Sequence, residues 1–225
     1  MPVAISDISF INLAYFNMMN LSDIASGSDE GDRLSSIINA NALIMEKFCN
    51  RPLKARNFYY EAPVEELEGE IYNYDEKYST FNPPEGTSFW FPTYPVNSIT
   101  EFLITGTAIS PSTDYTGDDG YILYKSKGNL YYSGGFDYGY FNNVKIKWNG
   151  GYSSSHIEDY NQLQYIQFLF TKFLYDNDPI NDSIIKETLS NYSYTRANPK
   201  DLADFMGIPI LVFNLLNSYR RMYFP

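Results

Sequence analysis

The chain is poor in the residues from which most active sites are built. It contains one cysteine, Cys49, and one histidine, His156, among 225 residues. A lone cysteine cannot form an intrachain disulfide, and these two residues are too few for a zinc site, which takes three or four nitrogen and sulfur ligands. The phosphate-binding patterns G-x-x-x-x-G-K-[ST] and G-x-G-x-x-G do not occur, and neither does the nucleophile pattern G-x-S-x-G. We therefore expect no catalytic residue, no bound metal and no cofactor.

Basic charge and long apolar runs are also scarce. The chain carries 16 Lys and Arg against 27 Asp and Glu, a formal net charge of −11. Sequence-independent binding of nucleic acid requires clustered Lys and Arg, so we do not expect sequence-independent binding to the phosphate backbone. No run approaches the roughly 20 apolar residues of a membrane helix, and residues 1–20 lack the basic region and cleavage site of a secretory signal. We expect no membrane partner.

Aromatic residues, in contrast, are abundant. Tyr and Phe number 22 and 16, and aromatic residues make up 18% of the chain. Tyrosine combines apolar area with a polar tip, so an excess of it is typical of sheet surfaces and protein interfaces.

Helical periodicity occurs at the two ends of the chain. Apolar residues recur every three or four positions in residues 30–50, and Asn41 interrupts that apolar face. Asp29, Glu30 and Asp32 precede or begin this segment, where acids favour a helix start, and Arg51-Pro52 ends it. The predicted helices span residues 8–21, 30–50, 157–176, 183–189 and 209–219.

Strand patterns fill the middle of the chain. Val144, Ile146 and Trp148 alternate with Lys145 and Lys147, which predicts a strand with one buried and one wet face. The predicted strands cover residues 58–60, 88–91, 98–104, 121–124, 129–132 and 144–148. Helices, then strands, then helices indicate an α+β fold: a helical core of residues 1–52 and 152–225 and an antiparallel β module of residues 53–151, with an acidic loop or hairpin at 64–76.

Three local groups have both a structural and a chemical interpretation. His156 follows three serines, Ser153–Ser155, which we expect to cap the next helix rather than to form a catalytic set. Cys49 is expected to be a small buried hydrophobe. Asp114, Asp118 and Asp119 precede Gly120, but their spacing does not match an EF-hand loop, so a plain turn is favoured over a calcium site.

Four ordered segments resemble the head–tail connector (adaptor, or head-completion) proteins of tailed bacteriophages. They are IINANALIMEKFCNR at 37–51, FPTYPVNSI at 91–99, VKIKWNGGY at 144–152, and KETLSNYSY at 186–194 followed by LLNSYRR at 215–221. Ser190-Asn191 replaces the family's usual Gly-Asp, and the β part is longer than in small members.

The resemblance implies a non-enzymatic subunit of a ring, commonly of twelve copies. Such a ring lies in the neck of the virion, is assembled in the host cytoplasm, and joins the portal protein to tail or stopper proteins. DNA passes through its lumen without specific binding. The acidic charge fits that passage, and Glu65, Glu66, Glu68 and Glu70 are candidates for an acidic ring or lumen surface.

The end of the chain is the candidate contact with the portal or a neighbouring subunit. It pairs Tyr219, Met222, Tyr223 and Phe224 with Arg220 and Arg221, which are residue types enriched in interfaces. A frayed terminus is the alternative for this segment. For the whole protein the alternative is a β-rich carbohydrate-binding or tail-associated module, in which Trp90, Tyr131 and Tyr132 would form a sugar platform; the flanking helices weigh against it.

Overall fold

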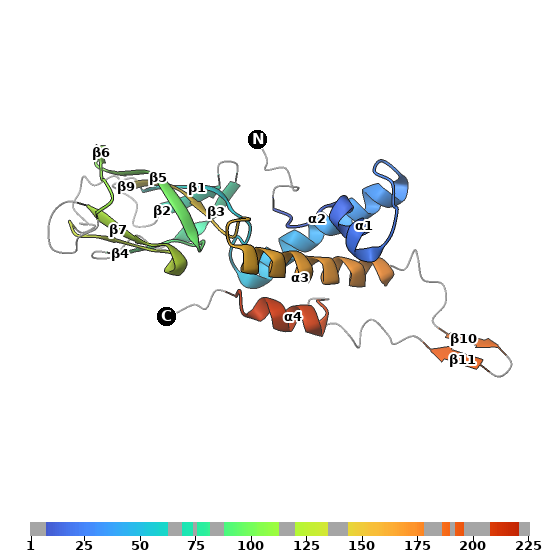
Figure 1. Cartoon of the computed structure of the whole chain (residues 1–225). Coiled ribbons are helices and arrows are strands. Elements are labelled where there is room, and N and C mark those ends of the chain that lie inside the picture. Colours follow the sequence, from blue (N-terminus) through green and yellow to red (C-terminus); the bar gives the residue numbers. More distant parts are fainter. Residues whose placement is uncertain are drawn as a thin grey trace. The chain divides into compact units, whose positions relative to one another are not determined.

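A computed structural model of the chain divides it into two compact units (Figure 1). The strand unit comprises Met1–Ala4 and Pro52–Ser155, and the helical unit comprises Ile5–Arg51 and His156–Pro225. The structure describes residues 8–62, 69–73, 76–81, 88–112, 120–134, 144–177, 186–189, 192–195 and 208–220. The helical unit is thus built from two stretches of sequence, and Pro52–Ser155 of the strand unit lies between them along the chain.

The described residues of the helical unit contain four α-helices: α1 (Leu13–Asn20), α2 (Asp29–Cys49), α3 (Ile157–Asp176) and α4 (Ile210–Asn217). α3 spans the predicted range, and α2 differs from its predicted range by one residue at each end. α1 is shorter than the predicted 8–21, because Asn12 caps it by accepting a hydrogen bond from the Tyr15 amide.

The ends of α2 follow from its sequence. The Ser28 hydroxyl accepts a hydrogen bond from the Gly31 amide at the start. At the other end Asn50 takes the left-handed conformation with φ of 52°, and the Arg51 amide donates to the Glu46 carbonyl. Asn50 therefore ends the helix before the proline does.

Six strands form the larger sheet of the strand unit, in the order β3-β2-β1-β9-β5-β6 with antiparallel pairing. Their bounds are β1 (Arg56–Ala62), β2 (Gly69–Asn73), β3 (Glu76–Phe81), β5 (Val96–Ile104), β6 (Thr107–Ala108) and β9 (Val144–Gly150). Part of the predicted acidic loop at 64–76 is therefore strand β2 and the start of β3, whereas residues 63–68 and 74–75 lie outside the described residues.

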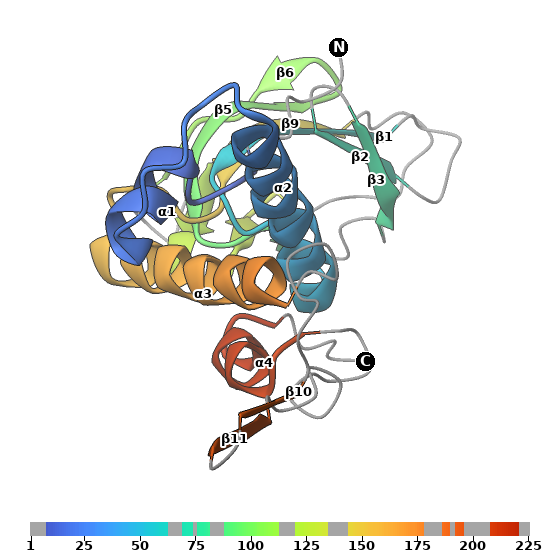
Figure 2. The same ribbon diagram turned by 90° about the vertical axis from the view of Figure 1, so that its right-hand side faces the viewer.

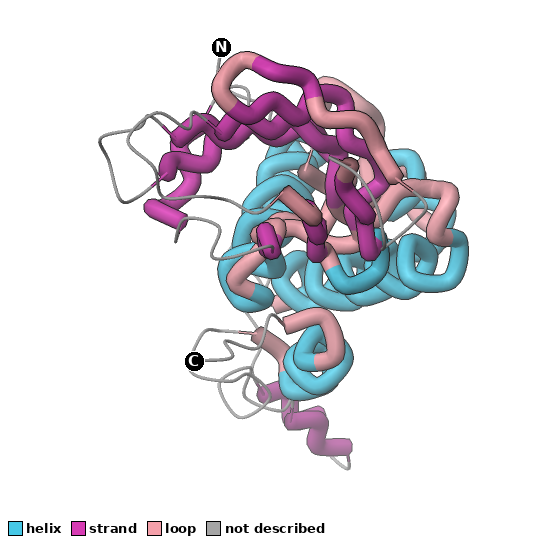
Figure 3. Tube along the Cα trace, turned by 90° about the vertical axis from the view of Figure 1, so that its left-hand side faces the viewer, coloured by secondary structure: helices cyan, strands magenta, loops and turns pink. Residues whose placement is uncertain are grey.

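A second sheet has three strands in the order β4-β8-β7, with β4 (Ser88–Trp90), β7 (Tyr121–Tyr124) and β8 (Asn129–Tyr132). The short 3-10 helix η2 (Lys125–Lys127) connects β7 to β8. The larger sheet appears as a curved layer of strands in Figure 3, and the two sheets share one core. β7 and β8 have the predicted bounds.

Aromatic rings fill the core of the strand unit. Trp148 is 1% exposed, stacks on Phe58 with 5.4 Å between ring centroids and packs against Phe91 at 5.0 Å. Its indole Nε1 donates a hydrogen bond to the Thr93 hydroxyl at 2.9 Å, so the ring is buried with its polar atom paired. The Tyr60 ring meets Phe89 across the two sheets, at 5.1 Å.

The helical unit has a more polar interior. Asn41 is fully buried on α2 and donates a hydrogen bond to the Thr171 hydroxyl of α3 at 3.1 Å. The asparagine that interrupts the apolar face of the sequence therefore faces a polar partner on the next helix. Figure 2 shows α2 and α3 crossing, with α1 beside them.

A hairpin replaces one predicted helix. β10 (Lys186–Leu189) pairs with β11 (Tyr192–Thr195) in antiparallel register, with Lys186 opposite Thr195. The predicted helix at 183–189 is therefore wrong for its last four residues, because pairing with the β-branched and aromatic residues of β11 overrides a weak local preference. Apart from this hairpin, the helices and the antiparallel strands lie in separate runs of sequence, and the predicted α+β class is confirmed.

Candidate assembly surfaces

The last described residues are anchored to the helical unit. Arg51, which is 4% exposed, donates a hydrogen bond from Nε to the Tyr219 carbonyl at 2.7 Å. The Tyr219 hydroxyl lies 2.8 Å from Gln162 Oε1 and 3.1 Å from Asp159 Oδ1 on α3. With 4% of its surface exposed, Tyr219 holds the chain end in place and does not offer its ring to a partner.

Arg220 follows as an exposed residue beside this anchor. Its guanidinium lies over the Phe48 ring at 5.5 Å, and Phe48 meets Phe213 of α4 at 5.0 Å. Arg221, Met222, Tyr223 and Phe224 lie outside the described residues. Their contact with a portal or a neighbouring subunit stays a prediction.

The acidic candidates are described in part. Glu70 belongs to β2, where it lies opposite Glu61 of β1. Glu65, Glu66 and Glu68 lie outside the described residues. An acidic ring or lumen surface built from these residues stays a prediction.

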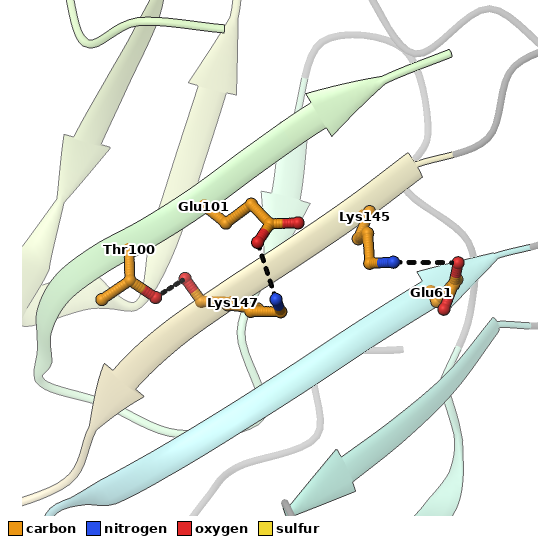
Figure 4. Close-up of polar contacts among 5 residues, drawn as sticks. All are labelled: Glu61, Thr100, Glu101, Lys145 and Lys147. Atoms are coloured by element: carbon orange, nitrogen blue, oxygen red, sulfur yellow. Dashed lines mark hydrogen bonds and ion pairs between the residues drawn. The ribbon is translucent and has the colours of Figure 1, made fainter. Parts of the chain in front are cut away.

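The outward face of β9 carries paired charges (Figure 4). Lys145 Nζ lies 3.3 Å from Glu61 of β1, and Lys147 Nζ lies 2.7 Å from Glu101 of β5. The Thr100 hydroxyl donates to the Lys147 carbonyl at 3.2 Å. The side chains of β9 alternate between buried and half-buried, which confirms the predicted wet and dry faces.

Both lysines also lie over the ring of Tyr59, which lies on β1 directly opposite Lys147. Lys145 Nζ is 5.4 Å from the ring centroid and Lys147 Nζ is 6.0 Å away. Each cation thus has a carboxylate and an aromatic neighbour, and this face is a solvated, charge-balanced layer.

Cys49 and His156 occupy positions that the fold itself explains. Cys49 is fully buried with its Sγ 3.7 Å from the Leu216 carbonyl, and burial raises the pKa of its thiol to about 12, which confirms the small buried hydrophobe. His156 is itself the N-cap residue of α3 and makes no capping hydrogen bond with its side chain, so the predicted capping by Ser153–Ser155 is wrong. The physical reason is that the helix begins only at Ile157, two residues after the last serine, so His156 and not a serine occupies the N-cap position.

Acidic clusters show no metal geometry in the described part of the chain. Within it, no group of three or more His, Cys, Asp or Glu side chains is arranged to hold a metal ion. Asp114, Asp118 and Asp119 lie outside it. Among the described residues no helix is long and apolar enough to cross a membrane.

The sugar platform of the alternative interpretation does not form from its three residues. Trp90 is 54% exposed, but Tyr132 is 8% exposed and packs edge-on against Phe102 at 5.7 Å. Because Tyr132 points into the core of the strand unit, it cannot stand beside Trp90 as an exposed stacking surface.

Gln167 is the structural residue that the sequence interpretation missed. It is fully buried on α3, where its Oε1 accepts hydrogen bonds from the Phe10 and Ile11 amides at 2.7 and 3.2 Å. Its Nε2 donates to the Ser9 hydroxyl and to the Ile38 carbonyl, both at 2.9 Å. One side chain thus ties residues 9–11 to α2 and α3, and its sequence signal was a glutamine on an otherwise apolar helix face.

Comparisons with known proteins give a match in structure and none in sequence. No protein-family model matches the sequence, and no curated protein matches it. A chain of a solved structure titled "Neck of empty GTA particle computed with C6 symmetry" matches with a TM-score of 0.55 and 14% identity, covering 100% of this chain and 95% of that chain. A chain of "Virion of native gene transfer agent (GTA) particle" matches with a TM-score of 0.52, the same identity and the same coverage.

The likeness spans the whole chain, so both units belong to the shared fold. It is the fold of a chain in a phage-like neck particle, which confirms at the level of the fold the resemblance to head–tail connectors predicted from sequence.

Proposed function

We propose that the protein is a structural subunit of a virion neck, a head–tail connector (adaptor) that joins the portal to the tail as a ring and lets DNA pass through its lumen. The observation that carries the proposal is the match over 100% of the chain to a chain from the neck of a gene transfer agent particle. Under this proposal the protein performs no catalysis.

The segments that resemble the connector family support the proposal through their contacts. The closing arginine of the first segment, Arg51, binds the carbonyl of Tyr219 in the last segment. Two resembling segments, 168 residues apart, thus form one joint.

The Gly-Tyr end of the third segment also has a structural reason. Gly151 has φ of 104°, and a Cβ on it would lie 2.7 Å from the backbone of Lys54. Tyr152 then donates its amide to the Leu53 carbonyl at 2.7 Å. Glycine is required where the last strand of the unit meets its first residues.

Charge supports passage of DNA through the lumen. In the proposed ring of twelve copies, the net charge of −11 per chain sums to on the order of −130 formal charges. A surface of this sign repels phosphate, so DNA moves past it without adhering.

The partners follow from the same proposal. The portal lies on one side of the ring and tail or stopper proteins on the other, and residues 221–224 dock on the portal or on a neighbouring subunit. Tyr219, anchored by Arg51, fixes the point from which that segment starts.

Purified particles test the neck position. An epitope is inserted within the strand unit, so that the C-terminal residues stay unchanged. Particles labelled with an antibody to the epitope are then viewed by electron microscopy. Label at the head–tail junction, together with a recombinant complex of protein and portal seen by native mass spectrometry, is expected. Particles without the protein at the neck, or a strict monomer that binds glycans and no portal, would contradict the proposal.

A truncation tests the docking segment. Removal of residues 222–225 should leave the circular dichroism spectrum unchanged and weaken portal binding. A chain of the same length with Met222, Tyr223 and Phe224 replaced by serine is the matched control for length, and it should show the same loss. Unchanged portal binding of both chains would remove the docking role of this segment.

A further inference from the structure

Two helices of the helical unit carry no charged residue although each exposes a face. α1 reads LAYFNMMN and α4 reads ILVFNLLN, whereas α2 and α3 contain acids and bases. A helix at a protein surface normally places charged and polar residues on its outer face. Uncharged outer faces therefore indicate surfaces that are covered in the working form of the protein.

The exposed apolar side chains on these helices form two named surfaces. The α1 surface consists of Met18, Met19 and Leu21, which are 63%, 40% and 95% exposed. The α4 surface consists of Ile210 and Leu211, which are 53% and 59% exposed. Flexible methionines beside a leucine are typical of adaptable contact surfaces.

The two surfaces belong to helices on opposite sides of α3. In both Figure 1 and Figure 2, α1 lies above α3 and α4 lies below it. α4 is held there by Phe213, which packs on Phe48 of α2, and α1 by Phe16, which packs on Phe168 of α3. One copy of the chain therefore cannot cover one surface with the other.

Leu21 is held in a conformation that its side chain disfavours. It has φ of 51° at the C-cap of α1, a position where glycine or asparagine is preferred. Its side chain is almost fully exposed, so the strain brings no packing within the chain. Burial of this side chain against another molecule would offset the cost of the left-handed conformation.

Charges beside the two surfaces are complementary. Asp23 follows the α1 surface, and Asp29 and Asp32 begin α2; all three are exposed. The cations at that end are engaged, because Arg33 lies over the Tyr175 ring and Lys172 pairs with Asp176. On the α4 side, Lys47 is exposed next to Phe48, which packs on Phe213 of α4, and the exposed Arg220 lies over the Phe48 ring as Arg33 lies over Tyr175.

We propose that the α1 surface of one copy binds the α4 surface of the next copy, head to tail. Two different surfaces on opposite sides of one unit are what a repeating contact between identical subunits requires, and such a contact closes a ring when the rotation between copies is right. A second copy also supplies both the apolar partner and the opposite charge. The inference rests on the proposed ring function and names the residues that build its contact.

Complementary variants test this pairing. Variant A carries Met18→Gln and Leu21→Asn, which replace the two most exposed residues of the α1 surface and place asparagine where the backbone prefers it. Variant B carries Ile210→Glu and Leu211→Glu, where acids at the start of α4 favour its helix dipole and oppose the acids of the neighbour. Both sets are expected to keep the fold, and thermal unfolding verifies it.

Sedimentation velocity is then measured for each full-length chain over a wide range of concentration. Variants A and B alone should associate about tenfold to hundredfold more weakly than the wild type. An equimolar mixture should form a 1:1 dimer and nothing larger, because one intact surface of each kind remains. Trp90→Glu, a matched change of an exposed apolar residue in the strand unit, should associate like the wild type.

Each other outcome overturns the inference. Wild-type protein that stays monomeric shows that the two surfaces do not bind each other, and variants that associate normally show that other residues make the contact. A mixture of A and B that stays monomeric excludes the head-to-tail pairing.

Cross-linking gives an independent readout, with purified protein in solution and with assembled particles. Leu21→Cys together with Leu211→Cys and a short bis-maleimide should give a ladder of multimers, whereas each single variant should give none. Cys49 is fully buried, so it contributes little background. Dimers alone in the double variant would indicate a two-fold contact and contradict the inference.

The two proposals fail in different ways. A protein present at the neck whose double variant gives no ladder keeps the proposed function and loses the inference. A protein that forms the ladder in solution and is absent from the neck keeps the head-to-tail contact and loses the connector function.

Discussion

The two units of the chain are stabilised by different means. The strand unit buries rings: Trp148, Phe58, Phe89 and Phe91 pack against one another between two sheets. The helical unit buries polar groups among apolar ones, namely Asn41, Arg51, Gln167 and Thr171. The tyrosine and phenylalanine excess of the sequence is therefore used most densely in the strand unit.

The difference indicates which interactions stabilise each unit and which fix the positions of its elements. Rings of similar size can exchange places in a core, so an aromatic core gives much stabilisation and modest directional constraint. A buried amide with four partners accepts one arrangement of its neighbours and penalises others. We infer that burial sets the stability of the strand unit, whereas hydrogen bonds set the positions of the helices that carry the two assembly surfaces.

Both tryptophans, Trp90 and Trp148, lie in the strand unit. Tryptophan fluorescence therefore reports the strand unit, and the helical signal of circular dichroism at 222 nm is dominated by the helical unit. The two probes allow each prediction below to be assigned to one unit.

The largest effect is expected at the centre of the aromatic core. Trp148→Ala should lower the free energy of unfolding of the strand unit by about 4 kcal/mol, because it leaves a large cavity and an unpaired Thr93 hydroxyl. Urea titration followed by the fluorescence of Trp90 measures it. Trp90→Ala is the matched control and should cost less than about 1 kcal/mol, since Trp90 is 54% exposed. An equal shift of the 222 nm transition in Trp148→Ala would show that the two units unfold as one.

A smaller effect is expected in the helical unit. Gln167→Leu should lower its free energy of unfolding by about 2 kcal/mol, because buried amides of Phe10 and Ile11 lose their acceptor. The 222 nm transition in urea measures it. Gln164→Leu is the control, since Gln164 is half-buried and makes one bond, to the Phe10 carbonyl at 3.1 Å. If Gln167→Leu leaves the free energy of unfolding unchanged, apolar burial stabilises both units, and the proposed difference between them is wrong.

The outward face of the larger sheet should contribute little. In a double-mutant cycle of Lys147→Ala and Glu101→Ala, the coupling should be about 0.5 kcal/mol and should shrink in high salt, because the two side chains are 32% and 28% exposed. Urea titration at two salt concentrations measures it. A coupling several times larger would mean that this face, and not the aromatic core alone, stabilises the strand unit.

The smallest effect near neutral pH is expected at Cys49. Burial raises the pKa of its thiol to about 12 from an ordinary value of 9.0, so the folded state holds the proton that the unfolded state releases. The contribution to stability is complete below pH 9 and is lost as the pH rises from 9 towards 12. Ellman's reagent at pH 8 should react slowly with the folded protein and quickly in urea. Fast reaction without urea would show that the end of α2 opens readily.

Much of the fold followed from local pattern. α3, β7 and β8 have the predicted bounds because their apolar spacing, turn residues and lengths all favour one structure. α1 begins later than predicted because residues 9–11 bind Gln167, a partner more than 150 residues away. β10 was taken for a helix because its pairing with β11, and not its own composition, decides its structure.

The candidate surfaces were predictable only in part, because their exposure depends on residues that are distant in sequence. The Tyr-Arg end of the chain was noticed, but the burial of Tyr219 depends on Arg51, Asp159 and Gln162 from other segments. The exposure of Met18, Leu21 and Leu211 could not be read from sequence either, because an apolar residue on a helix is ordinarily assigned to the core.

The junction at Gly151 has a consequence for how such chains diversify. The Ala55 amide donates to the Tyr152 carbonyl at 2.9 Å, and Lys54 and Tyr152 form a parallel bridge, so the entry and the exit of the strand unit lie side by side. A segment whose two ends are adjacent can be lengthened, exchanged or replaced by a short linker with little cost to the rest of the chain. The length and content of the segment between Ala55 and Tyr152 can in this sense change without moving the two points at which the chain enters and leaves it.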